Sequence, residues 1–94
     1  MVTVVPVRVT LLTQRACTYC EHAKVVLARV GQDFDISIDE VSLQSDEGRS
    51  LASRHGVMFA PGVLLDGRAF SYGRLSERKL RKELSRFGVA HDPR

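Results

Sequence analysis

The two cysteines of this 94-residue chain are separated by only two residues, in the segment Cys17-Thr18-Tyr19-Cys20. The segment before them, Val4 to Leu12, is rich in β-branched residues and predicts a strand buried on both faces. After the pair, apolar residues recur at helical spacing as far as Gly31, a residue that suits a helix end. The cysteines therefore stand where a strand gives way to a helix. The apolar residues at helical spacing are Tyr19, Ala23, Val26, Leu27 and Val30.

A thiol at the start of a helix has unusual chemistry. The first backbone N–H groups of a helix lack partners within it, and the helix dipole places partial positive charge there. A thiolate at Cys17 would accept those hydrogen bonds, so we expect its pKa to lie below the value of about 8.5 for a free cysteine. Arg15 adds positive charge if its side chain turns toward the sulfur. Cys20 lies one turn on, within disulfide reach, and should be more buried. We therefore predict that Cys17 attacks and that Cys20 resolves the mixed disulfide.

Two other interpretations of the cysteine pair are open. The cysteines could be two small buried residues of a helix, or they could bind zinc together with His22 and His55. Structural zinc takes four ligands, usually as two spaced pairs. His22 is expected on the exposed face of its helix, pointing away from the cysteines, and His55 has no second ligand near it. The strand–helix–strand context favours redox chemistry instead, and we expect no metal.

The segment 34–41, FDISIDEV, alternates apolar and polar residues and predicts a second strand, parallel to the first. A helix between two such strands makes a right-handed crossover. Ser45 or Asp46 can cap a second helix that ends at Gly56. Its inward-facing residues are expected to be Leu51, Ala52 and His55.

Two short apolar runs, 63–65 and 69–72, flank Asp66-Gly67, which is a hairpin turn signal. A last helix follows, with a hydrophobic contact across its first turn. It is marked by Ser76 as N-cap, by Leu75 packing on Leu80, by a buried stripe of Leu80, Leu84 and Phe87, and by Gly88 as its end. The order β-α-β-α-β-β-α predicts a three-layer α/β/α sandwich around a four-stranded mixed sheet. We expect one domain over residues 1–94, with 91–94 as a tail.

The composition limits the possible partners and compartments. The net charge of +3 comes from dispersed basic residues, without a basic stripe interleaved with aromatics, so no nucleic-acid partner is expected. The amino-terminal segment has no basic leading part, and no stretch approaches the roughly 18 apolar residues that a membrane helix needs. We therefore expect a cytoplasmic protein without a membrane partner. Thiols are kept reduced in that compartment, which argues against a purely structural disulfide.

The CTYC segment, the segment FAPGVLLDG and the order of elements together resemble the thioredoxin-fold superfamily, and within it a small glutaredoxin-like or thioredoxin-like protein. The resemblance implies a cis peptide bond between Ala60 and Pro61 at the start of the third strand, opposite the cysteines. The Ala60 backbone would then be open to pair with an extended substrate. Tyr19 matches the tyrosine of the glutaredoxin motif Cys-Pro-Tyr-Cys, with ordinary helix packing as the alternative. We assign Arg15, Tyr19, Ala60 and Pro61 to substrate binding.

The predicted function is that of a monomeric, glutaredoxin-like thiol–disulfide oxidoreductase with no bound cofactor. Its substrates would be disulfides of proteins or small thiols, and glutathione or another low-molecular-weight thiol would supply electrons. The segment FSYGRLSER lacks the Gly-Gly and Asp residues with which glutaredoxins hold glutathione. Residues 71–74 are similar to the Ser-Gly-Phe-Arg of ribonucleotide-reductase redoxins, which implies thioredoxin reductase as an alternative donor. An iron–sulfur carrier and a redox-sensing binding domain without turnover remain as further alternatives.

Overall fold

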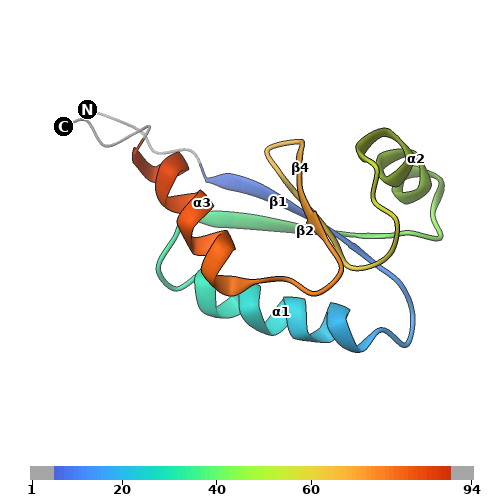
Figure 1. Ribbon diagram of the computed structural model, residues 1–94, viewed down its shortest axis with the longest axis horizontal. Helices are drawn as coiled ribbons and strands as arrows, with labels where there is room; N and C mark the ends of the chain where they lie inside the picture. Colours follow the sequence, from blue (N-terminus) through green and yellow to red (C-terminus); the bar gives the residue numbers. More distant parts are fainter. Residues whose placement is uncertain (1–5, 90–94) are drawn as a thin grey trace.

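The computed structural model describes residues 6–89, which form the predicted α/β order of seven elements (Figure 1). The predicted class and order are therefore confirmed. The predicted strand residues Val4 and Val5 and the predicted tail lie outside the described residues. The elements are β1 Val7–Thr13, α1 Thr18–Val30, β2 Ile36–Ser42, α2 Asp46–His55, β3 Gly62–Leu65, β4 Arg68–Tyr72 and α3 Glu77–Val89.

The four strands form one mixed sheet in the order β2-β1-β3-β4, with β1 and β2 parallel and the other two pairs antiparallel. In this register Gly62, the first residue of β3, pairs with Leu12 on one side and with Tyr72 on the other. The end of β1, the start of β3 and the end of β4 therefore lie together at one end of the sheet. The cysteine pair follows β1 at this end.

The helices cover the two faces of the sheet unequally. Helices α1 and α3 lie side by side on one face, and α2 lies over one end of the other face (Figure 1). The main core is packed between the sheet and α1 and α3. The predicted inner residues of α2 are only half-buried, because this short helix covers a small part of its face. The core consists of Val9, Leu11, Ala23, Val26, Leu27, Val30, Val63, Leu65, Leu75, Leu80 and Leu84.

Local signals in the sequence place the helix ends and the hairpin. The Ser45 hydroxyl accepts a hydrogen bond from the Gly48 N–H, and the Ser76 hydroxyl accepts one from the Lys79 N–H, as N-caps do. Asp66 and Gly67 have φ angles of 50° and 81°. Positive φ at both central residues is what a two-residue type I′ hairpin turn requires. The predicted N-caps and turn are confirmed. The predicted end of the last helix at Gly88 is wrong, because α3 continues to Val89; a glycine ends a helix where its backbone turns left-handed, not by its presence alone.

Two details differ from the periodicity. Tyr19 lies at the helical spacing of the buried residues of α1, but its side chain is 52% exposed, whereas Cys20, at 1%, is buried as expected. The predicted spacing holds from Ala23 to Val30, and only its first residue, Tyr19, faces solvent. The second strand begins at Ile36, and Ile38 is exposed because β2 is an edge strand with no neighbour beyond it. No helix within residues 6–89 is long and apolar enough to cross a membrane.

Candidate active site

Cys17 is the N-cap of α1, with an extended backbone that brings its sulfur onto the open end of the helix. The Cys20 N–H donates a hydrogen bond to Cys17 Sγ over 3.1 Å. The two cysteines form a disulfide, with their Cα atoms 5.2 Å apart. Cys17 is partly exposed, whereas Cys20 lies in the first turn and is buried. Only Cys17 therefore offers its sulfur to a molecule arriving from solvent.

The turn between β1 and α1 places two exposed residues directly before Cys17. Ala16 has a φ of 51°, in the left-handed region that costs a residue with a Cβ about 1–2 kcal/mol. Non-glycine residues in such conformations concentrate at functional sites. Arg15 makes no ion pair within the described part of the chain, so its guanidinium is free to meet an anion.

The bond between Ala60 and Pro61 is cis, as the resemblance implied. Pro61 is fully buried, and its carbonyl accepts a hydrogen bond of 2.8 Å from the Gly73 N–H. Within residues 6–89, no backbone hydrogen bond uses the N–H or C=O of Ala60. Ala60 as a whole is only 7% exposed, so access to its backbone is narrower than we expected. The sheet register places both residues at the end of the sheet where the cysteines lie.

Exposed apolar side chains border this end of the sheet, and the sequence analysis did not predict that most of them are exposed. Met58 and Phe59 directly precede Ala60 and are 72% and 58% exposed. Tyr72 at the end of β4 is 44% exposed, and its ring meets that of Phe59 edge to face, with centroids 5.0 Å apart. We call Met58, Phe59 and Tyr72 the aromatic platform. The available signal was a pair of large apolar residues in a loop, next to the proline.

A polar cluster lies one helical turn beyond Cys20. The Lys24 ammonium is 3.3 Å from carboxylate oxygens of both Glu21 and Glu40. Hydrogen bonds to Glu21 first and then Glu40 raise the pKa of Lys24, so this lysine is held as a cation. The hydroxyl of the buried Thr13 also donates to Glu40. The cluster therefore ties α1 to the ends of β1 and β2 beside the resolving cysteine.

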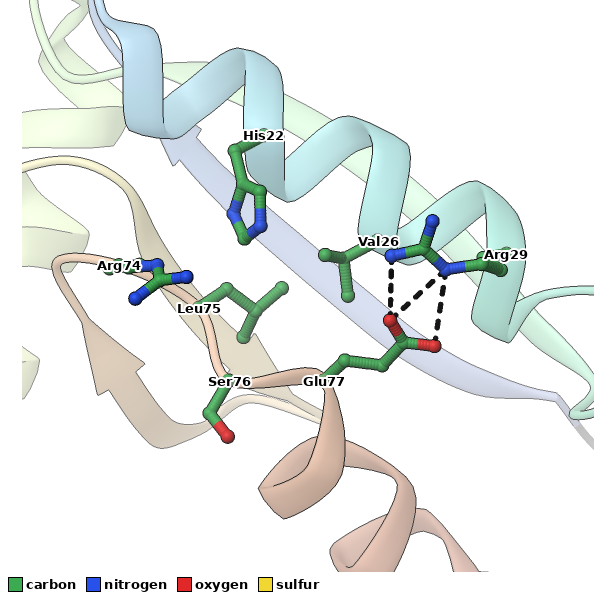
Figure 2. Close-up of a pocket in the computed structure, with 7 residues that line it drawn as sticks. All are labelled: His22, Val26, Arg29, Arg74, Leu75, Ser76 and Glu77. Carbon is green, nitrogen blue, oxygen red and sulfur yellow. Dashed lines mark hydrogen bonds and ion pairs between the residues drawn. The ribbon is translucent and has the colours of Figure 1, made fainter.

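His22 and His55 line separate pockets, and no cysteine lines those pockets. His22 was predicted on an exposed face, but it is half-buried and faces the connection between β4 and α3 (Figure 2). It borders a cavity of about 400 Å³ with Arg74, Ser76 and the ion pair between Arg29 and Glu77. Its Nδ1 is buried and has no hydrogen-bond partner within residues 6–89. No three His, Cys, Asp or Glu side chains of that range gather in an arrangement that could hold a metal ion.

Comparison with solved structures identifies the fold. A mutant thioredoxin from Halobacterium salinarum is similar, with a TM-score of 0.68 and 21% identity over 94% of this chain and 77% of the other. An uncharacterized thioredoxin-like protein from Clostridium perfringens gives a TM-score of 0.69 and 18% identity, covering 92% of this chain and 74% of the other. The predicted thioredoxin fold is therefore confirmed.

Sequence comparison identifies the family. Uncharacterized proteins of Mycobacterium bovis and Mycobacterium tuberculosis are each 34% identical over 92 residues, which is 93% of this chain and 94% of each relative. Residues 8–85 match the family described as "Glutaredoxin-like domain (DUF836)". This match includes the cysteine pair, the cis-proline segment and the seven elements up to most of α3. The chain belongs to the glutaredoxin-like domain family.

Proposed function

We propose that this protein is a glutaredoxin-like thiol–disulfide oxidoreductase that alternates between a dithiol and the Cys17–Cys20 disulfide. The observation that carries the proposal is the sulfur of Cys17 on the open end of α1, bonded to a buried Cys20. A thioredoxin-like fold with cysteines at this spacing is suited to thiol–disulfide exchange in general. The finer activity, including its substrate and its donor, is our proposal.

The reaction begins with the reduced pair. The Cys17 thiolate attacks one sulfur of a substrate disulfide, a mixed disulfide forms, and the other substrate sulfur leaves as a thiolate that takes up a proton. Cys20 then loses its proton and attacks Cys17 Sγ, which releases the second substrate thiolate. The substrate gains two electrons, and the protein is left with the Cys17–Cys20 disulfide. Two equivalents of a donor thiol, or a reductase, restore the dithiol.

The helix amide that now contacts Cys17 Sγ supports the role of this residue as nucleophile. A backbone N–H at a helix start stabilises a thiolate more than a thiol, since hydrogen bonds to charged acceptors are the stronger ones. Arg15 would add attraction for the anion. Tyr19, exposed between the two cysteines, would contact the substrate, and the Ala60 backbone would pair with it. Pro61 would shape that pairing site.

The residues that follow Gly73 bear on the identity of the electron donor. Arg74 follows Gly73 where a glutathione-binding site would carry a carboxylate, and Glu77 in that region is held by Arg29 and Arg81. An ammonium group of glutathione would thus lack a free partner there. This favours thioredoxin reductase or a low-molecular-weight thiol other than glutathione. We propose a cytoplasmic monomer without a bound cofactor and without nucleic-acid or membrane partners.

A donor-profiling assay tests the proposal. The protein would be incubated with a disulfide substrate and with NADPH plus thioredoxin reductase, with glutathione, or with other small thiols. Wild type should turn over with at least one donor, Cys17→Ser with none, and Cys20→Ser should accumulate a mixed disulfide seen by mass spectrometry. A wild type that stays inactive with every donor, although its pair is shown to be reduced, would refute catalysis and leave a non-catalytic role such as redox sensing.

A further inference from the structure

The exposed large hydrophobic side chains of the described chain gather near the cysteine pair. Four of the six lie at the end of the sheet where the cysteines lie: Tyr19 between the cysteines and the three residues of the aromatic platform. The other two, Val25 and Ile38, lie elsewhere, on α1 and on the edge strand β2. Exposed apolar side chains that cluster, rather than occurring singly, mark surfaces that bind a partner.

We propose that the aromatic platform docks an extended, acidic polypeptide segment that carries a large apolar side chain next to its reactive cysteine. This inference rests on the proposed function and names its substrate class as protein disulfides. The platform would hold the apolar side chain, and Arg15 and Arg74 would attract the acidic ones. A small disulfide would use the sulfur of Cys17 without needing either feature.

The two aromatic rings of the platform, Phe59 and Tyr72, are held in place before any partner arrives. The Phe59 ring contacts Tyr72 edge to face. It also lies over Gly73, where a Cβ would come within 3.1 Å of the Phe59 ring and force it to move. Gly73 has a φ of 84° and donates its N–H to Pro61, which fixes the loop under the ring. A surface that is ordered in advance loses less conformational entropy on binding.

The platform is continuous with the segment that would pair with a polypeptide backbone. Phe59 directly precedes Ala60, whose N–H and C=O have no backbone partner within residues 6–89. Tyr72 pairs with Gly62, the residue after Pro61. A peptide that forms strand-like hydrogen bonds with Ala60 would therefore place its next side chain over Phe59. In strand addition, the added peptide forms backbone hydrogen bonds with the sheet, and alternate side chains of the peptide are held by the protein surface.

The charges around the platform select for an acidic partner. Arg15 lies two residues before Cys17, and Arg74, which also borders the cavity beside His22, lies two residues after Tyr72. Both are exposed, and neither has an ion-pair partner in the described part of the chain. Glu21, the carboxylate in the first turn of α1, is paired with Lys24. The rim is thus cationic, and complementary charge raises association rates and disfavours basic partners.

A panel of disulfide-containing peptides tests the inference. The peptides would differ at the residue beside the cysteine, Phe or Ser, and in the flanking charges, Asp or Lys, with 2-hydroxyethyl disulfide as the small reference substrate. Wild type should reduce the Phe/Asp peptide with a kcat/KM at least about tenfold above that of the Ser/Lys peptide. The preference should lie mainly in KM and should shrink as salt is raised, because salt screens exposed charges.

Matched variants connect the preference to the platform. Phe59→Ser and, independently, Met58→Ser should lower kcat/KM for the Phe/Asp peptide at least about fivefold more than for the small disulfide. Arg74→Gln should remove the preference for Asp. Val25→Ser removes an equally exposed apolar side chain elsewhere on the protein and should change neither value, provided that circular dichroism confirms folding of each variant.

Two results would overturn the inference. If wild type reduces all peptides with equal kcat/KM, or if Phe59→Ser and Val25→Ser behave alike, the platform does not select substrates, although the oxidoreductase activity stands. If wild type reduces neither the peptides nor the small disulfide, the proposed function fails and this inference fails with it.

Discussion

At the scale of single residues, the redox site is built from backbone that the sequence alone does not favour. Ala16 adopts a left-handed conformation directly before Cys17, and this turn delivers the sulfur to the start of α1. A glycine would take that conformation without a steric penalty. The alanine therefore stores a small amount of strain at the site, compensated by the packing of β1 and α1 on either side.

Replacing Ala16 by glycine should stabilise the protein by about 0.5–1 kcal/mol. The removed left-handed penalty of about 1–2 kcal/mol exceeds the extra entropy of about 0.5–1 kcal/mol that glycine loses on folding. Urea unfolding of the oxidised protein measures the change. The matched control is Ala28→Gly, on the exposed face of α1 in ordinary helical conformation, which should destabilise by about 1 kcal/mol. Equal destabilisation by both changes would show that Ala16 is unstrained.

Residue-scale exposure was the least predictable property of the site. Cys17, Cys20 and Pro61 could be identified because their types and spacing carry the chemistry. Met58 and Phe59 lie in a loop, where no period indicates which side chains face solvent. Tyr19 lies in the first turn of α1, where apolar spacing alone does not show which side chain faces solvent.

At the scale of elements, the backbone of helix α2 lies close against the end of β2 at Gly48. A Cβ on this residue would overlap the backbone carbonyl of Ser42 at the end of β2. Backbone cannot yield as a flexible side chain can, so the helix would have to shift. The glycine thus sets the distance between β2 and α2.

Gly48→Ala should destabilise the protein by about 1–3 kcal/mol through this overlap, even though alanine favours helices. Thermal and urea unfolding measure the loss. Ser50→Ala, on the exposed side of the same helix, is the control and should be neutral or slightly stabilising. Unchanged or higher stability of Gly48→Ala would contradict the close approach.

Helices α1 and α3 are joined by a network of charges centred on Glu77. Its carboxylate forms ion pairs with Arg29 of α1 and with Arg81 of its own helix, and Arg81 also forms an ion pair with Asp33. Hydrogen bonds from Arg29 and then Arg81 lower the pKa of Glu77 below its ordinary value of 4.5. A carboxyl with a lowered folded-state pKa contributes stability above its unfolded-state pKa and loses that contribution as pH falls through the folded-state value.

The urea midpoint should therefore fall as pH is lowered from about 5 toward 3, and part of this dependence should vanish in Glu77→Gln. At neutral pH, Glu77→Gln should itself be less stable than wild type. Glu47→Gln, an exposed carboxyl of α2 without an ion pair in the described residues, provides the comparison and should keep the wild-type pH profile. Identical profiles for wild type and Glu77→Gln would exclude a role for this network in acid stability.

The elements themselves could be predicted almost completely. The alternation in 34–41, the caps Ser45 and Ser76 and the Asp66-Gly67 turn each encode a local structure that needs no distant partner. The order of strands across the sheet and the partial cover by α2 depend on contacts between distant segments. Those contacts explain why Ile38, an apolar residue of the alternating segment, is exposed on the outer strand β2.

At the scale of the whole molecule, the disulfide lies at the margin of the core: Cys20 is buried, but it is not part of the main apolar cluster. The core lies between the sheet and the lengths of α1 and α3, whereas Cys17 caps one end of α1. The disulfide closes a loop of only four residues, for which the chain-entropy estimate is about 2 kcal/mol. The native structure should therefore not depend on it.

Reduction of the pair should lower the free energy of unfolding by no more than about 2 kcal/mol and leave a cooperative two-state transition. Paired urea titrations with and without a strong reductant, read by circular dichroism, measure this. The free energy of unfolding of the Cys17→Ser, Cys20→Ser double variant should be close to that of the reduced protein. The two should differ only by the hydrogen bond that the Cys17 thiolate accepts from the helix, because serine is uncharged. Loss of cooperative unfolding on reduction would mean that the disulfide is a structural staple after all.

The three segments that meet at the site, 14–17, 58–61 and 73–76, are irregular backbone outside every strand and helix. Mutations at their exposed positions can accumulate with little effect on the scaffold. The exceptions are the cysteine, proline and glycine positions that fix their shape, the buried Ala60 and Leu75, and the helix cap Ser76. The same scaffold is thus open to retargeting: a library randomised at the exposed positions of these loops would sample new specificities while most of its members still fold.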